Sequence, residues 1–276
     1  MSARVFSSVL WGACALVLAF LVLPLVAVFT LVPPRELLDQ LSSPVVRDAL
    51  SVTVKTNLVA LALILGLGTP AAYLIATRVF PGRALVVTLI ELPLVLPPAV
   101  AGIGLLAAFG RAGLLGDELG LLGITVSFTQ TAVVLAVCFV AGPFYVRPAI
   151  ASFEAVDPTL VAASRTLGAG PARTFIRIAL PLAGGGLSAG AALAFARGLG
   201  EFGATIMFAG SLQGVTQTLS LAIYQEFDLN FDTALAISAL LILVSAVLLL
   251  SVKAVAGWRS TSVSLIPFAR SRSSSA

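Results

Sequence analysis

Long, nearly unbroken apolar runs constrain this chain more than any other feature of its sequence. The first extends from Val9 to Leu31, and its 23 residues can cross a bilayer core about 30 Å thick as a helix. It is too long for a cleaved signal, so it is expected to be a retained first helix. Only 10% of the 276 residues are charged, against about 25% in a soluble domain. The sequence therefore predicts an all-α polytopic membrane protein.

Six apolar runs predict one transmembrane domain at 1–260, followed by a flexible tail at 261–276. The expected spans are 9–31, 52–76, 85–109, 131–146, 182–208 and 233–252. Pro93, Pro97 and Pro98 interrupt the hydrogen-bond ladder of the third span, and Arg147-Pro148 is expected to end the fourth. Such a break is tolerated at membrane depth only where protein or a water-filled cavity satisfies the freed carbonyl groups.

Basic residues predict the orientation of these spans. With the N-terminus inside, the inner segments hold Arg4, Arg78, Arg83, Arg147, Arg165, Arg173, Arg177, Lys253, Arg259, Arg270 and Arg272. The outer segments hold Arg35, Arg47, Lys55 and Arg111, and Arg197 lies inside a span. An excess of Lys and Arg marks the cytoplasmic side. The bias places the N-terminus and the segment 154–181 in the cytoplasm.

Glu154 to Pro181 is the long polar interruption in the second half of the chain. Asp157 is a suitable N-cap, Pro158 suits a first helical position, and Gly168 can adopt the left-handed conformation that ends a helix. A second helix is expected to begin after Gly170 and to end at Leu180-Pro181. The segment therefore predicts two short helices joined by a hinge.

The same segment resembles the cytoplasmic signature of inner-membrane permease subunits of binding-protein-dependent ABC importers. That signature reads Glu-Ala-Ala, three residues, Gly, nine residues, Ile, one residue, Leu-Pro, and the chain departs from it at Ala162 and Ser164. The resemblance implies a helix that docks on an ATPase subunit through Ala162, Ala163, Ser164, Arg165, Gly168, Ala169, Ile178, Leu180 and Pro181. The alternative is an amphipathic loop lying on the membrane surface.

Three further stretches, 92–102, 200–205 and 216–224, are similar to permeases for molybdate, tungstate and sulfate, with molybdate the most similar. The resemblance implies a type I ABC importer permease fold in a prokaryotic cytoplasmic (inner) membrane. The implied partners are a second copy of the subunit, two cytoplasmic ATPase subunits and an external oxyanion-binding protein. ATP and Mg are expected on the partner ATPase, so no cofactor and no nucleic acid is expected on this chain.

The composition argues against catalysis by this chain. Its two lysines, Lys55 and Lys253, both follow valine, so neither belongs to the Gly-Lys-Ser/Thr of a P-loop. There is no histidine, which removes the usual base of a nucleophilic enzyme and the commonest metal ligand. Cys14 and Cys138 lie in apolar runs and are expected to be inert. The sequence predicts a non-catalytic subunit.

Charges inside the predicted spans are the remaining clues, because placing one in lipid costs about 2.5–3.5 kcal/mol or more. A tentative translocation path includes Glu91, Pro97, Pro98, Arg197, Glu201 and Thr205. Arg197 and Glu201 are four residues apart and can pair on one helix face, so a structural role as neutralised charges is the favoured reading for them and for Glu91. A separate alternative is a proton-coupled secondary carrier or channel that uses Glu91 or Glu201.

The outer connection 209–230 contains Glu226 and Asp228 but no Lys or Arg. An acidic outer connection of this kind repels a dianion and does not concentrate it. We therefore expect the external binding protein to select the cargo, and these acids to dock its basic surface.

Overall fold

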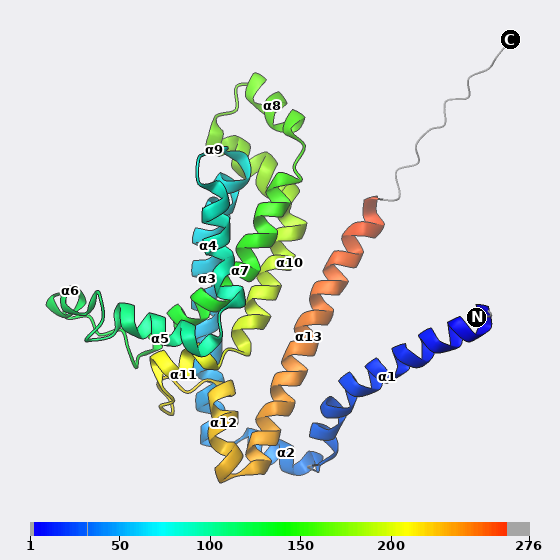
Figure 1. Cartoon of the computed structure of the whole chain (residues 1–276), viewed down its shortest axis with the longest axis vertical. Helices are drawn as coiled ribbons and strands as arrows, with labels where there is room; N and C mark the ends of the chain where they lie inside the picture. Colours follow the sequence, from blue (N-terminus) through cyan, green and yellow to red (C-terminus); the bar gives the residue numbers. More distant parts are fainter. Residues whose placement is uncertain (1–2, 32, 264–276) are drawn as a thin grey trace. The chain divides into compact units, whose positions relative to one another are not determined.

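The computed structural model describes residues 3–31 and 33–263, and every regular element within these ranges is a helix. The elements are α1 (Ala3–Thr30), α2 (Pro34–Leu41), α3 (Pro44–Thr77), α4 (Arg83–Val95), α5 (Pro98–Phe109), α6 (Gly116–Leu121), α7 (Gln130–Glu154), α8 (Pro158–Thr166), α9 (Pro171–Thr174), the π-helical η1 (Phe175–Ala179), α10 (Leu180–Leu199), α11 (Gly203–Ala209), α12 (Leu219–Leu229) and α13 (Phe231–Val263) (Figure 1). The all-α prediction is confirmed.

Five helical stretches of the described chain are long and apolar enough to cross a membrane. They are Val5–Thr30, Pro44–Thr77, Gln130–Glu154, Pro171–Leu199 and Phe231–Ser251. A sixth candidate is the bent pair of α4 and α5, between which the helix breaks at Leu96 and Pro97. The break falls at the prolines that the sequence singled out. Pro98 begins α5, where its missing N–H has no helical partner to lose.

Two helices continue past the ends that the sequence predicted. α7 runs through Pro143 and Pro148 to Glu154, whereas the expected span ended at 146. Arg147 is tolerated inside this helix because Glu91 supplies its counter-charge, with 2.5 Å between Arg147 Nε and Glu91 Oε1. Pro171–Leu199 is one continuous helical stretch, so the expected end at Leu180-Pro181 is also wrong. The π-helical turn η1, a wider turn that relaxes the hydrogen-bond ladder, ends at Ala179, just before Leu180-Pro181.

The fifth span ends before the predicted residue 208, because α10 ends at Leu199. Glu201 precedes the next helix, α11, and its Oε1 accepts a hydrogen bond of 2.8 Å from the backbone N of Ala204 in that helix. At the far end of the chain, α13 extends to Val263, into the tail expected at 261–276. Residues 264–276 of that tail lie outside the described residues.

The chain divides into two compact units, which are described separately. Unit 1 holds residues 1–60, 95–140 and 197–245. Its larger core is formed by small and aliphatic side chains around Phe208, and its smaller core joins α3, α12 and α13. Within this unit α5 lies directly against α11: a Cβ added at Gly102 would stand 2.6 Å from the carbonyl oxygen of Ala204.

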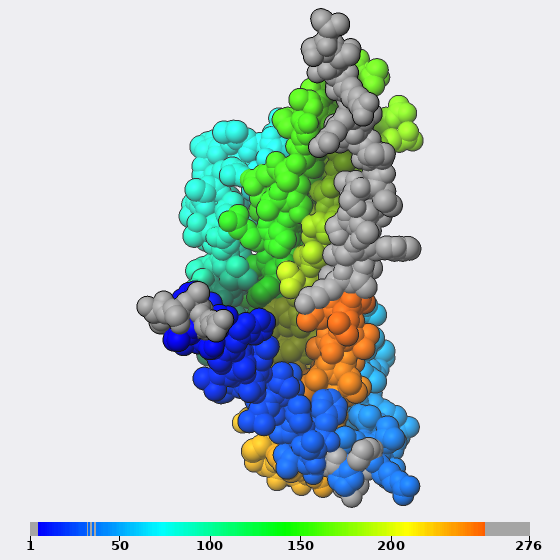
Figure 2. Space-filling view, turned by 90° about the vertical axis from the view of Figure 1, so that its right-hand side faces the viewer, coloured from blue at the N-terminus to red at the C-terminus, as the bar shows by residue number. Residues whose placement is uncertain are grey.

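Unit 2 holds residues 61–94, 141–196 and 246–276. α4, α7, α10 and the second half of α3 run side by side in it, and α8 and α9 lie at one end of this group (Figure 1). Figure 2 shows α4 (cyan) beside α7 (green) from a second direction. Ion pairs join these two helices at two levels, Arg83 with Glu154 and Glu91 with Arg147. Arg83 Nε also donates to the carbonyl oxygen of Ile75 at 2.9 Å, which links the end of α3 to the same corner.

Two glycines of α5 test the close packing in unit 1. Gly102→Ala places a methyl group against the backbone of α11, whereas Gly104→Ala places one in open space. Alanine favours a helix over glycine by about 1 kcal/mol, but overpacking costs about 1–3 kcal/mol. We expect Gly102→Ala to lower the melting temperature of the detergent-solubilised protein and Gly104→Ala to leave it equal or higher. Equal melting temperatures for the two variants would contradict the tight α5–α11 contact.

Candidate functional site

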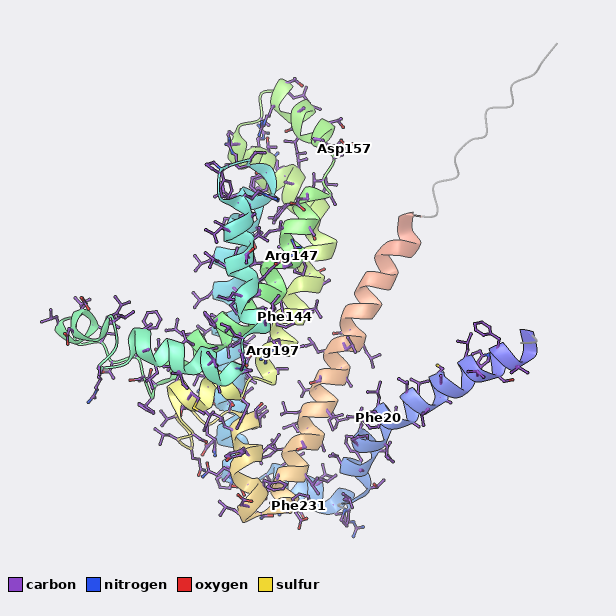
Figure 3. All side chains as sticks on the ribbon, viewed as in Figure 1. Phe20, Phe144, Arg147, Asp157, Arg197 and Phe231 are labelled. Atoms are coloured by element: carbon purple, nitrogen blue, oxygen red, sulfur yellow. The ribbon has the colours of Figure 1, made fainter. Side chains whose placement is uncertain are left out.

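The polar segment after α7 begins with a side-chain cap. Asp157 Oδ1 accepts hydrogen bonds of 2.8 Å from both the backbone N and the hydroxyl of Thr159, which confirms it as the N-cap of α8. The backbone hydrogen bond, and then the hydroxyl, lower the pKa of Asp157 from its ordinary value. The charged form is therefore the one that the folded segment favours, and its contribution is lost as the pH falls through that lowered pKa. Figure 3 places Asp157 at the α8 end of unit 2.

The hinge between α8 and α9 depends on one glycine. Gly168 has a φ of +79°, and the N–H of Ala169 bonds back to the carbonyl oxygen of Ser164 at 3.0 Å. A Cβ at Gly168 would meet nothing within 4 Å. The position therefore requires glycine for its left-handed backbone and not for lack of space.

A buried pair of hydroxyl groups fastens α8 to α9. Ser164 Oγ lies 3.0 Å from Thr174 Oγ1 and 2.8 Å from the carbonyl oxygen of Val161. Because the Ser164 hydroxyl donates to Val161, the Thr174 hydroxyl donates to Ser164. Ser164 occupies the place of an alanine in the signature, so this departure adds a hydrogen bond across the hinge. The spacing of the sequence did not indicate this bond between residues 164 and 174.

Three aromatic rings support the base of the segment in unit 2. Tyr73 of α3 packs at 5.3 Å from the Phe153 ring and at 4.7 Å from the Phe175 ring, measured between ring centroids. A cavity of about 420 Å³ opens beside them and is lined also by Ala162 and Arg165 of α8. Sequence reasoning missed this cluster, because its members come from three elements and share no local spacing.

The predicted coupling residues differ in exposure. Ser164 is buried, and three residues are half-buried: Ala169, Ile178 and Leu180. The other five are exposed: Ala162, Ala163, Arg165, Gly168 and Pro181. The exposed members are concentrated on α8 and its hinge. α8 is thus the more exposed part of the segment, whereas Ala169, Ile178 and Leu180 are half-buried.

A second cavity, of about 380 Å³, lies in unit 1 where two helices are interrupted. Pro97, Pro98, Arg197 and Glu201 line it together with Gly203, so four of the six predicted path residues meet there. The Arg197 position is labelled in Figure 3. Glu91 is elsewhere, in unit 2, paired with Arg147. Thr205 is fully buried, and its hydroxyl has no hydrogen-bond partner in the described part of the chain.

The predicted pair of Arg197 and Glu201 is present, with 2.8 Å between Arg197 Nη2 and Glu201 Oε2. This contact is an ion pair without the angles of a hydrogen bond, whereas Oε1 makes a proper hydrogen bond to α11. The Glu201 side chain is 1% exposed and that of Arg197 is 26% exposed. A buried carboxylate needs such compensation to stay ionised. Both residues line the cavity, and the arginine is the more exposed of the two.

A protein family described as "Binding-protein-dependent transport system inner membrane component" matches residues 64–263. The chain belongs to this family. It is 44% identical over 241 residues to a molybdenum transport system permease protein of Mycobacterium bovis, covering 86% of this chain and 90% of the relative. It is 36% identical over 217 residues to a sulfate transport system permease protein of Salmonella typhimurium, covering 78% of each.

Solved structures show the same fold at low sequence identity. A bacterial alginate ABC transporter gives a TM-score of 0.72 at 16% identity, covering 90% of this chain and 91% of that one. The methionine ABC transporter MetNI gives a TM-score of 0.58 at 18% identity, covering 77% of this chain and 94% of that one.

Family membership confirms the ABC permease resemblance and places the chain in the inner membrane as a multi-pass protein. Its relatives are permease subunits, so ATP hydrolysis belongs to a separate partner. The secondary-carrier alternative is not supported. Glu91 and Glu201, which that alternative needed as titrating groups, are each held in an ion pair.

The Arg197–Glu201 pair gives a testable stability difference. Arg197→Met leaves a buried carboxylate without its counter-charge, which costs about 3–5 kcal/mol. Adding Glu201→Gln removes that charge and keeps an oxygen for the backbone N of Ala204, so the double variant should recover most of the loss. Thermal unfolding in detergent measures the stability of the single variant and of the double variant.

Arg147→Met is the matched control, since its partner Glu91 is 35% exposed and such a pair contributes only about 0–1 kcal/mol. A double variant no more stable than Arg197→Met alone would contradict the assigned role of the pair.

Proposed function

We propose that this chain is the translocation subunit of an ATP-driven oxyanion importer, with molybdate as the cargo and tungstate and sulfate as the other anions of the same class. The similarity to molybdenum permeases carries the proposal: 44% identity over 90% of the Mycobacterium bovis relative, against 36% over 78% of the sulfate relative. Family membership supplies the class of transporter. The choice among the oxyanions depends on the relatives alone.

The segment 154–181 is the connection to the ATPase in this proposal. α8 presents exposed residues and is tied to α9 by the Ser164–Thr174 hydrogen bond. A helix held in this way can pass a displacement to the rest of unit 2, because the ring contacts of Tyr73 with Phe153 and Phe175 join the base of the segment to α3 and α7. The π-helical turn η1 joins this segment to α10, and such turns often occur at functional sites.

The complete transporter would contain two copies of this chain, two cytoplasmic ATPase subunits and an external oxyanion-binding protein. ATP and Mg would be bound by the ATPase subunits, with no cofactor on this chain. The cavity of Pro97, Pro98, Arg197 and Glu201 would form part of the path, with Thr205 near it. Glu91 would stabilise unit 2 through Arg147 and would not contact the cargo.

The hinge glycine tests both the class and the coupling. We expect the wild-type transporter, reconstituted with its ATPases and binding protein, to import molybdate only with ATP. Gly168→Val forces a β-branched residue into the left-handed region, a strain of about 1–3 kcal/mol, and reshapes the hinge. ATP hydrolysis should persist while molybdate uptake falls about tenfold or more.

Gly170→Val is the control, because Gly170 has a φ of −69° and open space around it. Its uptake should equal that of wild type. Normal uptake by Gly168→Val would contradict the hinge role, and wild-type uptake that follows a pH gradient without ATP would overturn the proposed function.

α12 is the proposed docking surface for the external binding protein. It carries Glu226 and Asp228 near its C-terminal end, and no Lys or Arg lies between 209 and 230. Neutralising both acids, in Glu226→Gln with Asp228→Asn, should weaken docking and flatten its salt dependence. Asp117→Asn with Glu118→Gln, on α6, is the control pair. Surface plasmon resonance at several salt concentrations measures the effect; unchanged affinity and salt slope in the α12 variant would remove this role.

A further inference from the structure

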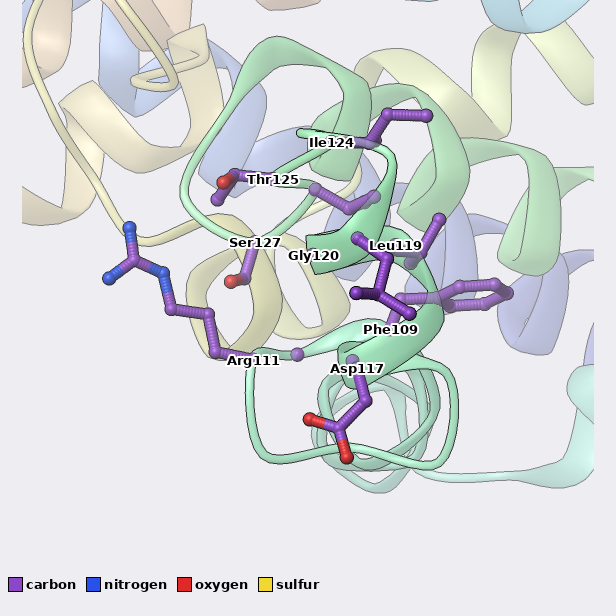
Figure 4. Close-up of a pocket in the computed structure, with 12 residues that line it drawn as sticks. Phe109, Arg111, Asp117, Leu119, Gly120, Ile124, Thr125 and Ser127 are labelled. Atoms are coloured by element: carbon purple, nitrogen blue, oxygen red, sulfur yellow. The ribbon is translucent and has the colours of Figure 1, made fainter.

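Arg111 follows α5 in the connection that the charge bias places outside. It lines two adjoining cavities of unit 1, each of about 530 Å³, which share Arg111, Thr125 and Ser127 on their walls. Figure 4 shows the first cavity, in which the Arg111 guanidinium and the Thr125 and Ser127 hydroxyls lie on the same side. The Asp117 carboxylate points away from them in this view. The wall that the two cavities share therefore combines one cation with two hydroxyl groups.

None of these three side chains has a partner among the residues that the structure describes. Arg111 makes no ion pair there, and the hydroxyls of Thr125 and Ser127 make no hydrogen bond. As a residue Ser127 is only 6% exposed, whereas Arg111 and Thr125 are exposed. An unbonded hydroxyl on the wall that the two cavities share, together with an arginine that has no ion pair, indicates a site for a ligand that accepts hydrogen bonds.

We propose that this cluster, the Arg111 subsite, receives a tetrahedral oxyanion on its way to the path. Guanidinium groups bind oxyanions through parallel charge-assisted hydrogen bonds, and hydroxyls can bond the remaining oxygens. A single positive charge only half neutralises a dianion, so the subsite binds weakly. Weak binding is what a translocation path requires, because each binding site along it must also release the ion. The subsite recognises charge and shape and leaves cargo selection to the binding protein.

α5 connects this subsite to the cavity of Arg197. Its first residue, Pro98, lines the Arg197 cavity, and its last, Phe109, lines a cavity of the Arg111 subsite. Twelve helical residues cover about 18 Å. Unit 1 thus carries two arginines at opposite ends of one short helix, and the anion would pass from Arg111 to Arg197. This inference rests on the proposed function.

The test uses the complete transporter with saturating molybdate-loaded binding protein. Arg111→Gln should lower the turnover of uptake about tenfold, as expected when a hydrogen bond to a charged group is lost. Arg111→Lys keeps the charge and should retain more activity, and Ser127→Ala should lower turnover about threefold by the loss of one neutral hydrogen bond. Arg47→Gln, an exposed outer arginine that lines neither cavity, should match wild type.

A second measurement separates the subsite from the other proposals. Tungstate soaked into crystals of the complete transporter should give anomalous density beside Arg111 and Ser127 in wild type and none in Arg111→Gln. Wild-type turnover in both Arg111→Gln and Ser127→Ala would overturn the subsite while the proposed function stands. A loss of binding-protein affinity that accounts for the slower turnover of Arg111→Gln would assign Arg111 to docking and also overturn it. If wild type imports none of the three oxyanions, the proposed function fails, and the tungstate density alone decides the subsite.

Discussion

Every backbone amide inside a bilayer must find its hydrogen bond within the protein, and this constraint explains where the helices of the chain continue and where they stop. α7 continues through Pro143 and Pro148, and the helical stretch that contains Pro181 continues to Leu199. The ladder is interrupted at 96–97 and again at 200–202. These two interruptions meet at one cavity, where a Cβ on Gly203 would stand 2.7 Å from Cβ of Pro98. At the second, the Glu201 side chain supplies a bond that the helix no longer makes.

The three ion pairs of the described residues differ in how much water reaches them. Arg83 with Glu154 and Arg147 with Glu91 are partly exposed and lie at two levels between α4 and α7. They hold together the helices beside the coupling segment, with little cost when one is lost. Arg197 with Glu201 is different, because its carboxylate is buried and also caps α11. Removing one charge there affects both the stability of unit 1 and the wall of its cavity.

Local sequence was enough to predict much of the coupling segment and one ion pair of unit 1. The N-cap at Asp157, the hinge at Gly168 and the pairing of Arg197 with Glu201 depend on residues within a few positions of each other, where spacing alone defines geometry. The Ser164–Thr174 bond, the rings around Tyr73 and the pairing of Glu91 with Arg147 depend on contacts across helices. A sequence pattern carries no information on which faces of distant helices meet.

The sequence by itself determined the class of this protein, because so few charges and such long apolar runs are compatible only with helices in a membrane, and because the signature lies in one continuous segment. It did not determine where α7 and α10 end. In the structure α7 continues past Arg147, which pairs with Glu91 of another helix, and α10 is followed by a break at which the Glu201 side chain bonds the backbone N of Ala204 in α11. Only the tertiary structure decided these ends, since a charge or a proline inside a helix is tolerated when a neighbouring group compensates for it, and that neighbour is chosen by packing.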